Sequence, residues 1–384
     1  MTSYDLQKCT KCLLPQTHET IRFDAEGVCS VCLNSLHKGA VDWNARQLEL
    51  THIVEEIRTQ NKNYDCVVPF SGGKDSTFSL YYVVEILNLR PLVVSFDHGF
   101  YRGRLLENRN RVLQALGVDF ISFTPNWKLV KSLMLTSLRD RGDFCWHCHT
   151  GVNVFPVRTA LEKNISLIIW GESSTEYTNY YKTEQFHEID EELFNRITNL
   201  GISADDMLVR LDGDFQRRDL SPFEFPSQVE IASKGIRSFP LGNYIKWDTK
   251  SQVQLIKDKL GWKGDSVEGV PEEYDYEKIE CMMQGMRDYL KYRKRGYARA
   301  THLTSIDIRN GLLSREDAQS IVSNSENTKP YSLPLFLEIM GISEVELEEI
   351  ISTHVIDPWE GKLPVRIGKK PHDYESWIKK LLVK

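Results

Sequence analysis

Short apolar segments alternate with longer amphipathic ones between residues 64 and 262, and this pattern predicts the fold of the region. The apolar runs are typical of strands and the runs between them have helical spacing. Strands that are apolar on both faces and separated by helices indicate a parallel sheet covered on both sides, with right-handed crossovers. We therefore expect a doubly wound α/β core. The expected strands are 66–70, 91–96, 118–123, 165–170 and a short one near 236–239, and the expected helices are 77–88, 105–116, 127–140, 153–163 and one that begins at Asp248 or Thr249.

The pattern changes on either side of this core. Residues 1–40 have little apolar periodicity, which is typical of a small module without a core of its own. Helical spacing over 45–58 predicts a linker helix within 41–63, and the core extends over 64–260 with an irregular, partly acidic insertion near 173–235. From 261 to 384 the chain is expected to be mostly helical.

Composition places the chain among soluble, folded proteins. Its 384 residues are 41% hydrophobic and 27% charged, enough for two or three domains. A net charge of −6 makes the surface as a whole a poor binder of polyanions, so we do not expect a nucleic-acid partner. There is no apolar leader and no stretch of about 20 apolar residues, and we therefore expect a cytoplasmic protein without a membrane partner.

The loop Ser71-Gly72-Gly73-Lys74-Asp75-Ser76 joins the first expected strand to the first expected core helix. Glycines allow an anion to approach the backbone closely, and the helix N-terminus favours negative charge. The loop is not a Walker A motif, because Lys74 follows Gly73 at once and Asp75 stands where that motif needs a Ser or Thr. The sequence therefore predicts a different phosphate loop, and the alternative is a tight strand-to-helix turn without a ligand.

Six of the eight cysteines occur in Cys-x-x-Cys pairs. Sixteen residues separate the pair Cys9 and Cys12 from the pair Cys29 and Cys32, which is the spacing of a four-cysteine zinc ribbon. Four thiolates leave no open coordination position, so this predicts a structural zinc site.

The third pair, Cys145 and Cys148, lies inside the expected core. Its Cys-x-x-Cys-His pattern is that of c-type haem attachment, which does not suit the core of a protein expected to be cytoplasmic. The remaining interpretations are a redox dithiol, free thiols, a second zinc site with His147 or His149, and an iron–sulfur cluster. Cys281 is the candidate third ligand for a cluster, whereas Cys66 lies within an expected buried strand.

A basic, tyrosine-rich segment occupies 286–317. It could bind the phosphates of RNA or of a nucleotide-activated sugar, or it could be a solvated helix face. Its cations include Arg287, Lys291, Arg293, Lys294, Arg295 and Arg299.

The Ser-Gly-Gly-Lys-Asp-Ser string between strand and helix resembles the PP-loop of the ATP pyrophosphatase family, which has an adenine nucleotide alpha hydrolase-like core and cleaves ATP between its α- and β-phosphates. The resemblance implies that ATP and Mg²⁺ are bound, and that loop amides and hydroxyls hold the pyrophosphate. It implies candidate catalytic roles for Lys74, Asp75, Cys145 and Cys148. The implied nucleotide-binding residues are Ser71, Gly72, Gly73, Asp75, Ser76, Asp97, His98, Gly171 and Glu172, although His98 could also only cap a turn.

The combination of four N-terminal cysteines, the PP-loop, Cys-Trp-His-Cys and the basic segment resembles the N-acetyl sugar amidotransferases of surface-polysaccharide and flagellin-glycan biosynthesis. The resemblance implies conversion of an acetamido sugar into an acetamidino sugar, as in lipopolysaccharide biosynthesis, with ammonia from a separate glutaminase and channel protein.

Two other functions remain open. One is tRNA thiolation, which shares the adenylation step and would use a [4Fe-4S] cluster held by Cys145, Cys148 and Cys281. The other is a zinc-ribbon scaffold that binds AMP or ATP without turnover.

Overall fold

Five parallel strands form the central sheet of the computed structural model, which describes residues 6–19, 21–36, 41–60, 63–171, 201–211, 213 and 215–382. The strand order is β3-β2-β1-β4-β5, so the chain reverses its direction of winding between β1 and β4. This is the doubly wound arrangement expected from the sequence. The strands are β1 (Cys66–Pro69), β2 (Pro91–Phe96), β3 (Asp119–Phe123), β4 (Leu167–Trp170) and β5 (Arg237–Pro240).

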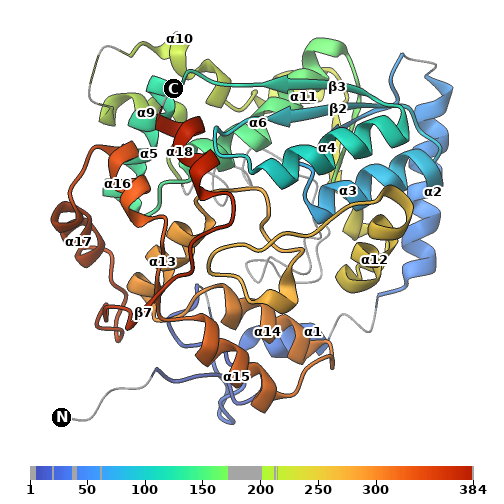
Figure 1. Cartoon of the computed structure of the whole chain (residues 1–384). Helices are drawn as coiled ribbons and strands as arrows, with labels where there is room; N and C mark the ends of the chain where they lie inside the picture. Colours follow the sequence, from blue (N-terminus) through green and yellow to red (C-terminus); the bar gives the residue numbers. More distant parts are fainter. Residues whose placement is uncertain are drawn as a thin grey trace.

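Helices cover both faces of the sheet (Figure 1). Successive residues of β1 point to opposite faces: Val68 packs with α2, α3 and α12, and Val67 packs with α6. The helices of the core are α2 (Trp43–Thr59), α3 (Lys74–Tyr81), α4 (Gly103–Leu116), α5 (Trp127–Arg141), α6 (Trp146–Lys163), α9 (Ala204–Arg210), α10 (Arg217–Leu220), α11 (Gln228–Ser233) and α12 (Thr249–Leu260).

Most expected elements are present with shifted ends. The first core helix begins at Lys74, directly after the loop, and continues as a π-helix over Tyr82–Ile86. The expectation of a helix beginning at residue 153 was wrong, because α6 begins at Trp146, whose ring is buried in the core, and runs through Pro156. Asp248 is the N-cap of α12, and its side chain accepts a hydrogen bond from the Ser251 N–H.

The insertion expected near 173–235 is described only in part, since residues 172–200 lie outside the described residues. Its described part forms α9, α10 and α11. Apolar side chains from this part, including Met207 and Phe223, pack with Leu133 of α5 and Trp146 of α6. This region therefore extends the layer on the α5–α6 side of the sheet.

The C-terminal region is mostly helical, as expected, and holds a two-stranded parallel sheet. Its own apolar core joins α13 and α16–α18 to α5 of the doubly wound core. Among the described residues, no helix is long and apolar enough to cross a membrane. The elements are α13 (Gln284–Arg295), α14 (Arg299–Arg309), α15 (Arg315–Ser325), β6 (Thr328–Lys329), α16 (Leu333–Met340), α17 (Glu344–Ser352), β7 (Arg366–Ile367) and α18 (Tyr374–Leu382).

The N-terminal module lies against this C-terminal region, with its helix α1 (Ser30–Leu36) beside α14 and α15 in Figure 1. The Arg295 guanidinium donates to the Thr17 carbonyl at 2.6 Å and pairs with the Glu19 carboxylate at 3.1 Å. The Tyr297 hydroxyl donates to the same carboxylate at 2.8 Å. Segments from opposite ends of the sequence are thus joined by polar contacts.

Candidate functional site

The Ser71–Ser76 loop lies at the carboxyl end of β1, next to the point where the strand order reverses. In open α/β sheets, ligands bind in the crevice at this place. Gly72 has a φ of +97°, and Gly73 is extended and forms the N-cap of α3. The loop therefore delivers its backbone to the N-terminus of a helix that packs against the sheet, which is the geometry of an anion site.

Ser76 holds the loop in shape through its hydroxyl. The Oγ atom accepts hydrogen bonds from the backbone N–H groups of Ser71 and Gly72, both at 3.3 Å, and donates to the Gly73 carbonyl at 3.2 Å. The Ser71 Oγ in turn accepts from the Gly73 N–H at 3.1 Å. Trp262 fixes the outer side, because its indole N–H donates to the Gly72 carbonyl at 2.9 Å. The structure thus brings all the predicted loop residues into one compact turn.

Gly171, at the end of β4, lies directly against this turn. A Cβ atom at Gly171 would come within 2.8 Å of the Ser76 Cα and 2.9 Å of the Ser76 N, distances that real Cβ atoms essentially never show. Only glycine therefore allows the end of β4 to approach the start of α3 this closely. Glu172, the other residue predicted here, lies outside the described residues.

Lys74 is buried and paired with two carboxylates. Its Nζ lies 2.6 Å from the Asp75 Oδ2 and 3.0 Å from the Glu277 Oε1, and the side chains of Lys74 and Glu277 are only 5% and 3% exposed. Burial on its own would raise the pKa of Glu277, but Lys74, Lys278 and Arg299 outweigh burial and lower it. The Lys74 ammonium is therefore fixed by a residue of the C-terminal region, which the sequence analysis did not single out.

A second glutamate of that region, Glu280, lies against the loop itself. A Cβ atom on Gly73 would fall 1.9 Å from the Glu280 Oε1, so the carboxylate occupies the space that the absent side chain leaves. A negatively charged oxygen thus already lies beside the loop glycine. A phosphate oxygen bound at this glycine would need the space that the Glu280 carboxylate occupies. Proximity to Cys281 in the string Glu-Lys-Ile-Glu-Cys was the only sequence signal for Glu277 and Glu280.

Asp97 and His98 follow β2 at the same edge of the sheet, and both accept hydrogen bonds from the turn that they form. The Gly99 N–H donates to the Asp97 Oδ1 at 2.8 Å, and the Phe100 N–H lies 3.3 Å from the His98 Nδ1. His98 is buried and its ring meets Tyr101 edge-on. Both residues have a structural role here, and contact with a nucleotide stays a prediction.

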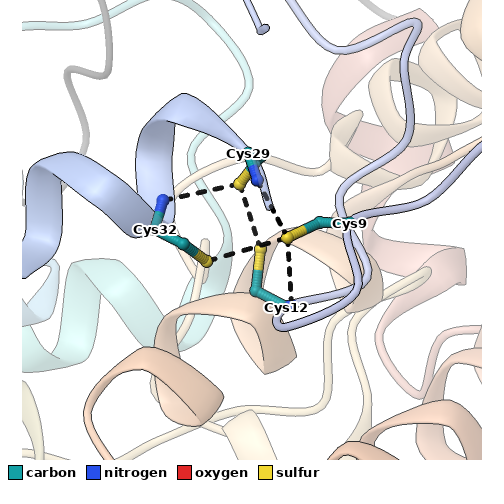
Figure 2. Close-up of side chains that lie close together, drawn as sticks. All are labelled: Cys9, Cys12, Cys29 and Cys32. Carbon is teal, nitrogen blue, oxygen red and sulfur yellow. Dashed lines mark hydrogen bonds between the residues drawn. The ribbon is translucent and has the colours of Figure 1, made fainter. Parts of the chain in front are cut away.

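The four N-terminal cysteines form a metal-ligand set (Figure 2). The Sγ atoms of Cys9 and Cys32 lie 3.9 Å apart, and those of Cys12 and Cys29 lie 3.6 Å apart. Four thiolates at about 2.3 Å from one zinc ion, in tetrahedral arrangement, have about this separation. Backbone N–H groups of Cys12 and Cys29 also donate to the Cys9 Sγ, which stabilises a thiolate. The site fits a zinc ribbon.

Cys145, Cys148 and Cys281 share one buried neighbourhood without forming such a set. Cys145 is the N-cap of α6, and Cys281 pairs as an isolated bridge with Tyr101, which follows β2. Each thiol of the α6 pair has its pKa raised, chiefly by burial and in part by Cys281; the value for Cys148 is about 12. In the described part of the chain only the N-terminal cysteines bring three or more ligand atoms within 4.8 Å. Cys145, Cys148 and Cys281 are therefore not close enough to bind a single ion together. An iron–sulfur cluster binds each thiolate through a different iron, so its ligands lie farther apart.

Most cations of the basic segment bind within the protein. Arg293 is buried and pairs with Glu348 at 2.6 Å, Arg299 lies 3.6 Å from Asp288, and Lys294 donates to a backbone carbonyl. Together with the bonds of Arg295, these contacts hold α13 between the N-terminal module and α17. These four side chains therefore have structural contacts, which a solvated helix face would lack, and binding of a phosphate by the segment stays a prediction.

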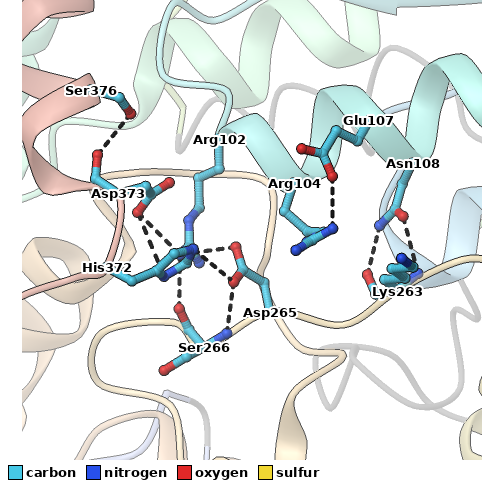
Figure 3. Close-up of polar contacts among 10 residues, drawn as sticks. All are labelled: Arg102, Arg104, Glu107, Asn108, Lys263, Asp265, Ser266, His372, Asp373 and Ser376. Carbon is cyan, nitrogen blue, oxygen red and sulfur yellow. Dashed lines mark hydrogen bonds and ion pairs between the residues drawn. The ribbon is translucent and has the colours of Figure 1, made fainter.

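The C-terminal region is held against the core by further polar contacts, among them those of Arg102 (Figure 3). Arg102, at the start of α4, is 1% exposed and lies 3.0 Å from Asp265 and 3.7 Å from Asp373 of the C-terminal region. Its guanidinium also donates to the Ser266 carbonyl at 2.8 Å. The backbone N–H of Met282 donates to the Phe100 carbonyl at 2.9 Å. The C-terminal region is thus an integral wall of the site.

One known family model matches most of the C-terminal region. Residues 268–381 match the family model described as "LPS biosynthesis protein WbpG-like, C-terminal domain". This range contains Glu277, Glu280 and Cys281, the residues that meet the loop and the internal cysteine pair.

Two curated proteins are similar to parts of the chain. An uncharacterized protein, MJ1599 of Methanocaldococcus jannaschii, is 29% identical over 115 residues, 30% of this chain and 41% of that protein. The glutamine-hydrolyzing GMP synthase of Pyrobaculum aerophilum is 33% identical over 85 residues, 22% of this chain and 17% of that protein. The chain therefore spans less than half of the length of each of these relatives.

Three solved structures are distantly similar. NMN synthetase from Francisella tularensis has 10% identity and a TM-score of 0.37, covering 79% of this chain and 98% of that one. The U34-tRNA thiolase NcsA from Methanococcus maripaludis, solved with its [4Fe-4S] cluster, has 14% identity and a TM-score of 0.33, covering 100% and 99%. The NH3-dependent NAD synthetase from Campylobacter jejuni has 13% identity and a TM-score of 0.28, covering 59% and 100%. The chain thus combines a parallel α/β core and a Ser-Gly-Gly-Lys-Asp-Ser loop with a C-terminal region similar to that of WbpG-like LPS biosynthesis proteins.

Proposed function

We propose that this protein is an ATP-dependent, AMP-forming amidotransferase. It adenylates the acetamido oxygen of an N-acetylated sugar and replaces that oxygen with ammonia-derived nitrogen, giving an acetamidino sugar for lipopolysaccharide or related glycan biosynthesis. The proposal rests on one observation. The Ser71–Ser76 loop lies where the strand order reverses, and the region that matches the WbpG-like model packs against the loop.

The loop suits the activation step. The amide oxygen attacks the α-phosphorus of ATP, the bond to the β-phosphate breaks, and pyrophosphate leaves. Backbone N–H groups at the start of α3 and the Lys74 ammonium would stabilise the negative charge on the leaving pyrophosphate. Bound Mg²⁺ would neutralise phosphate charge when present. Glu277 keeps the Lys74 ammonium in place, since their charged atoms are 3.0 Å apart in a buried site.

The second step replaces AMP. Ammonia attacks the carbon of the adenylated amide, the carbon–oxygen bond to AMP breaks, and loss of a proton leaves the amidine. We expect the ammonia to come from a separate glutaminase through a channel protein, and the four-cysteine module to bind zinc in a structural role.

The direct test supplies the purified protein with ATP, Mg²⁺, ammonium and a nucleotide-activated diacetamido sugar. We expect AMP, pyrophosphate and a sugar product in which NH replaces one oxygen atom, detected by mass spectrometry. ADP as the nucleotide product, or AMP formation that does not depend on the sugar, would contradict the proposal.

One observation favours tRNA thiolation as a second candidate. Cys148 and Cys281 both contribute to the raised pKa of the Cys145 thiol, and Cys281 bridges Tyr101, which follows β2. A cluster held by these three cysteines would supply sulfur to an adenylated base. Anaerobic purification with iron and sulfide analysis tests for the cluster, and mass analysis of tRNA nucleosides from a deletion strain tests the reaction. An unchanged set of thiolated nucleosides would remove this candidate.

A further inference from the structure

A cavity of about 280 Å³, lined by both apolar and charged side chains, lies between the core and the C-terminal region. The stretch 246–250, which leads from β5 into α12, forms one side of it. Tyr274, Tyr276, Glu277 and the end of α14 form the other side. The second side belongs wholly to the range that matches the WbpG-like model. Ligand sites occur preferentially at such junctions between structural units.

One side chain connects this cavity to the loop. Glu277 lines the cavity, and its carboxylate binds the Lys74 ammonium of the loop at 3.0 Å. The cavity therefore borders the buried ion pair that fixes the loop lysine. That is the position required of an acceptor whose oxygen must reach the α-phosphorus of ATP.

The charges around the cavity balance, which argues against a phosphate as its occupant. Asp307 binds Lys250 at 2.9 Å and accepts from the Tyr274 hydroxyl at 2.9 Å, and Asp248 caps α12. Glu277 is paired with Lys74, and the remaining lysine, Lys246, lies at an exposed position. The lining thus carries three carboxylates and two ammonium groups, and Lys74 balances the third carboxylate from the loop. A neutral ligand with several hydrogen-bonding groups matches this environment better than an anion does.

The size and lining of the cavity indicate which neutral ligand it accepts. Its volume lies just below the roughly 300–1,000 Å³ typical of ligand sites, so it suits one sugar ring and not a whole nucleotide. Trp247, Tyr274 and Tyr276 supply aromatic surface, while Asp307 and Asn310 supply hydrogen-bonding groups. A ring that carries hydroxyl and acetamido groups has both an apolar face and polar edges.

We infer that this cavity binds the N-acetylated sugar ring of the acceptor, with its acetamido group directed toward Glu277 and Lys74. The inference rests on the proposed function for the identity of the ligand, but the position of the site comes from the cavity, its charge balance and its contact with the loop. It places substrate selection in the C-terminal region and activation in the core.

The experiment measures binding of UDP-N-acetylglucosamine by saturation-transfer NMR. We expect saturation of the sugar-ring and acetyl protons in the wild type. Asn310→Trp places an indole at the end of α14 from an exposed position on the cavity lining, and we expect it to weaken binding at least about tenfold. The matched control is Asn324→Trp, the same change at an exposed position of α15 away from the cavity, which should bind as the wild type does.

A second pair of variants tests the same inference if Asn310→Trp does not fold. Leu312→Trp also narrows the cavity from a residue that is 53% exposed, and Leu363→Trp is its control at 66% exposure. All four variants should bind a non-hydrolysable ATP analogue normally. Absence of sugar-proton saturation in the wild type, or unchanged binding in a folded cavity variant, would overturn the inference.

Turnover separates this inference from the proposed function. If the amidino sugar forms and the cavity variants keep the wild-type KM for the acceptor, the cavity assignment is wrong and the function stands. If the cavity variants alone lose sugar binding but neither AMP nor amidine ever forms, the cavity assignment stands and the function is wrong.

Discussion

Glu277 is the residue through which the C-terminal region holds the loop lysine, and its replacement tests that connection. Glu277→Gln keeps the shape of the side chain and removes its charge, so no space opens in the core. The Lys74 ammonium, 5% exposed, would then lose this anionic partner and keep Asp75. Removing one member of a buried ion pair costs about 3–5 kcal/mol in the free energy of unfolding. Because Asp75 remains 2.6 Å from the ammonium, we expect a loss of about 3 kcal/mol, the lower end of that range.

The assays are urea unfolding and the rate of AMP formation. A displaced lysine should lower the rate by up to about 100-fold, the effect of roughly 1 Å of misplacement of a catalytic group. The control is Asp275→Asn, which breaks the pair of Asp275 with Lys257 at 3.3 Å. These side chains are 46% and 34% exposed, so the expected loss of stability is less than about 1 kcal/mol.

A double variant separates stability from chemistry. Lys74→Met combined with Glu277→Leu replaces the buried pair by apolar groups of similar volume, which is often neutral for stability or favourable. We expect unfolding close to that of the wild type and no recovery of AMP formation. If Glu277→Gln loses no more stability than the Asp275 control and keeps full activity, the reasoning about this ion pair is refuted.

Three further changes test other parts of the structure. Gly171→Ala should abolish binding of an ATP analogue and destabilise the fold by about 1–3 kcal/mol, because the new Cβ would collide with the backbone of Ser76. Titration calorimetry measures the binding, and scanning calorimetry measures the stability. Glu19→Gln should lower the free energy of unfolding at neutral pH, and the difference from the wild type should vanish as the pH falls from about 4.5 to about 2. Burial alone would raise the pKa of the Glu19 carboxyl, but Lys291 and Arg295 lower it to about 2. The ionised carboxyl therefore stabilises the fold above its unfolded pKa, and this stabilisation is lost as the pH falls through its folded pKa. Cys12→Ser should remove the zinc of the N-terminal module, measured by metal analysis, and loosen its contacts with α13.

Each of these has a control or a contradicting result. Gly103→Ala adds a methyl group at a glycine with nothing within 4 Å and should bind the analogue normally. A pH profile of unfolding for Glu19→Gln that runs parallel to that of the wild type from pH 7 to pH 2 would contradict the electrostatic account. Full zinc content in Cys12→Ser, or iron in place of zinc in the wild type, would contradict the zinc ribbon.

The sequence by itself determined the fold class and the loop. Alternating apolar and amphipathic runs are local signals, and β2 has the predicted bounds, Pro91–Phe96, because a strand buried on both faces must be apolar throughout. The glycine pair before Lys74 and the spacing of the four N-terminal cysteines are also local, since each follows from neighbours a few residues apart. These features needed no knowledge of tertiary contacts.

The tertiary structure alone decided what surrounds the loop. Glu277 and Glu280 are about two hundred residues from the loop in sequence, and nothing in their own neighbourhood indicates that one binds Lys74 and the other covers Gly73. The same holds for Arg293 and Arg295, which sequence alone presents as cations for a ligand and the fold uses as internal partners. The partner of a charged side chain depends on which distant segment packs against that side chain. Periodicity and spacing in the sequence cannot reveal this partner, because it is decided by tertiary packing.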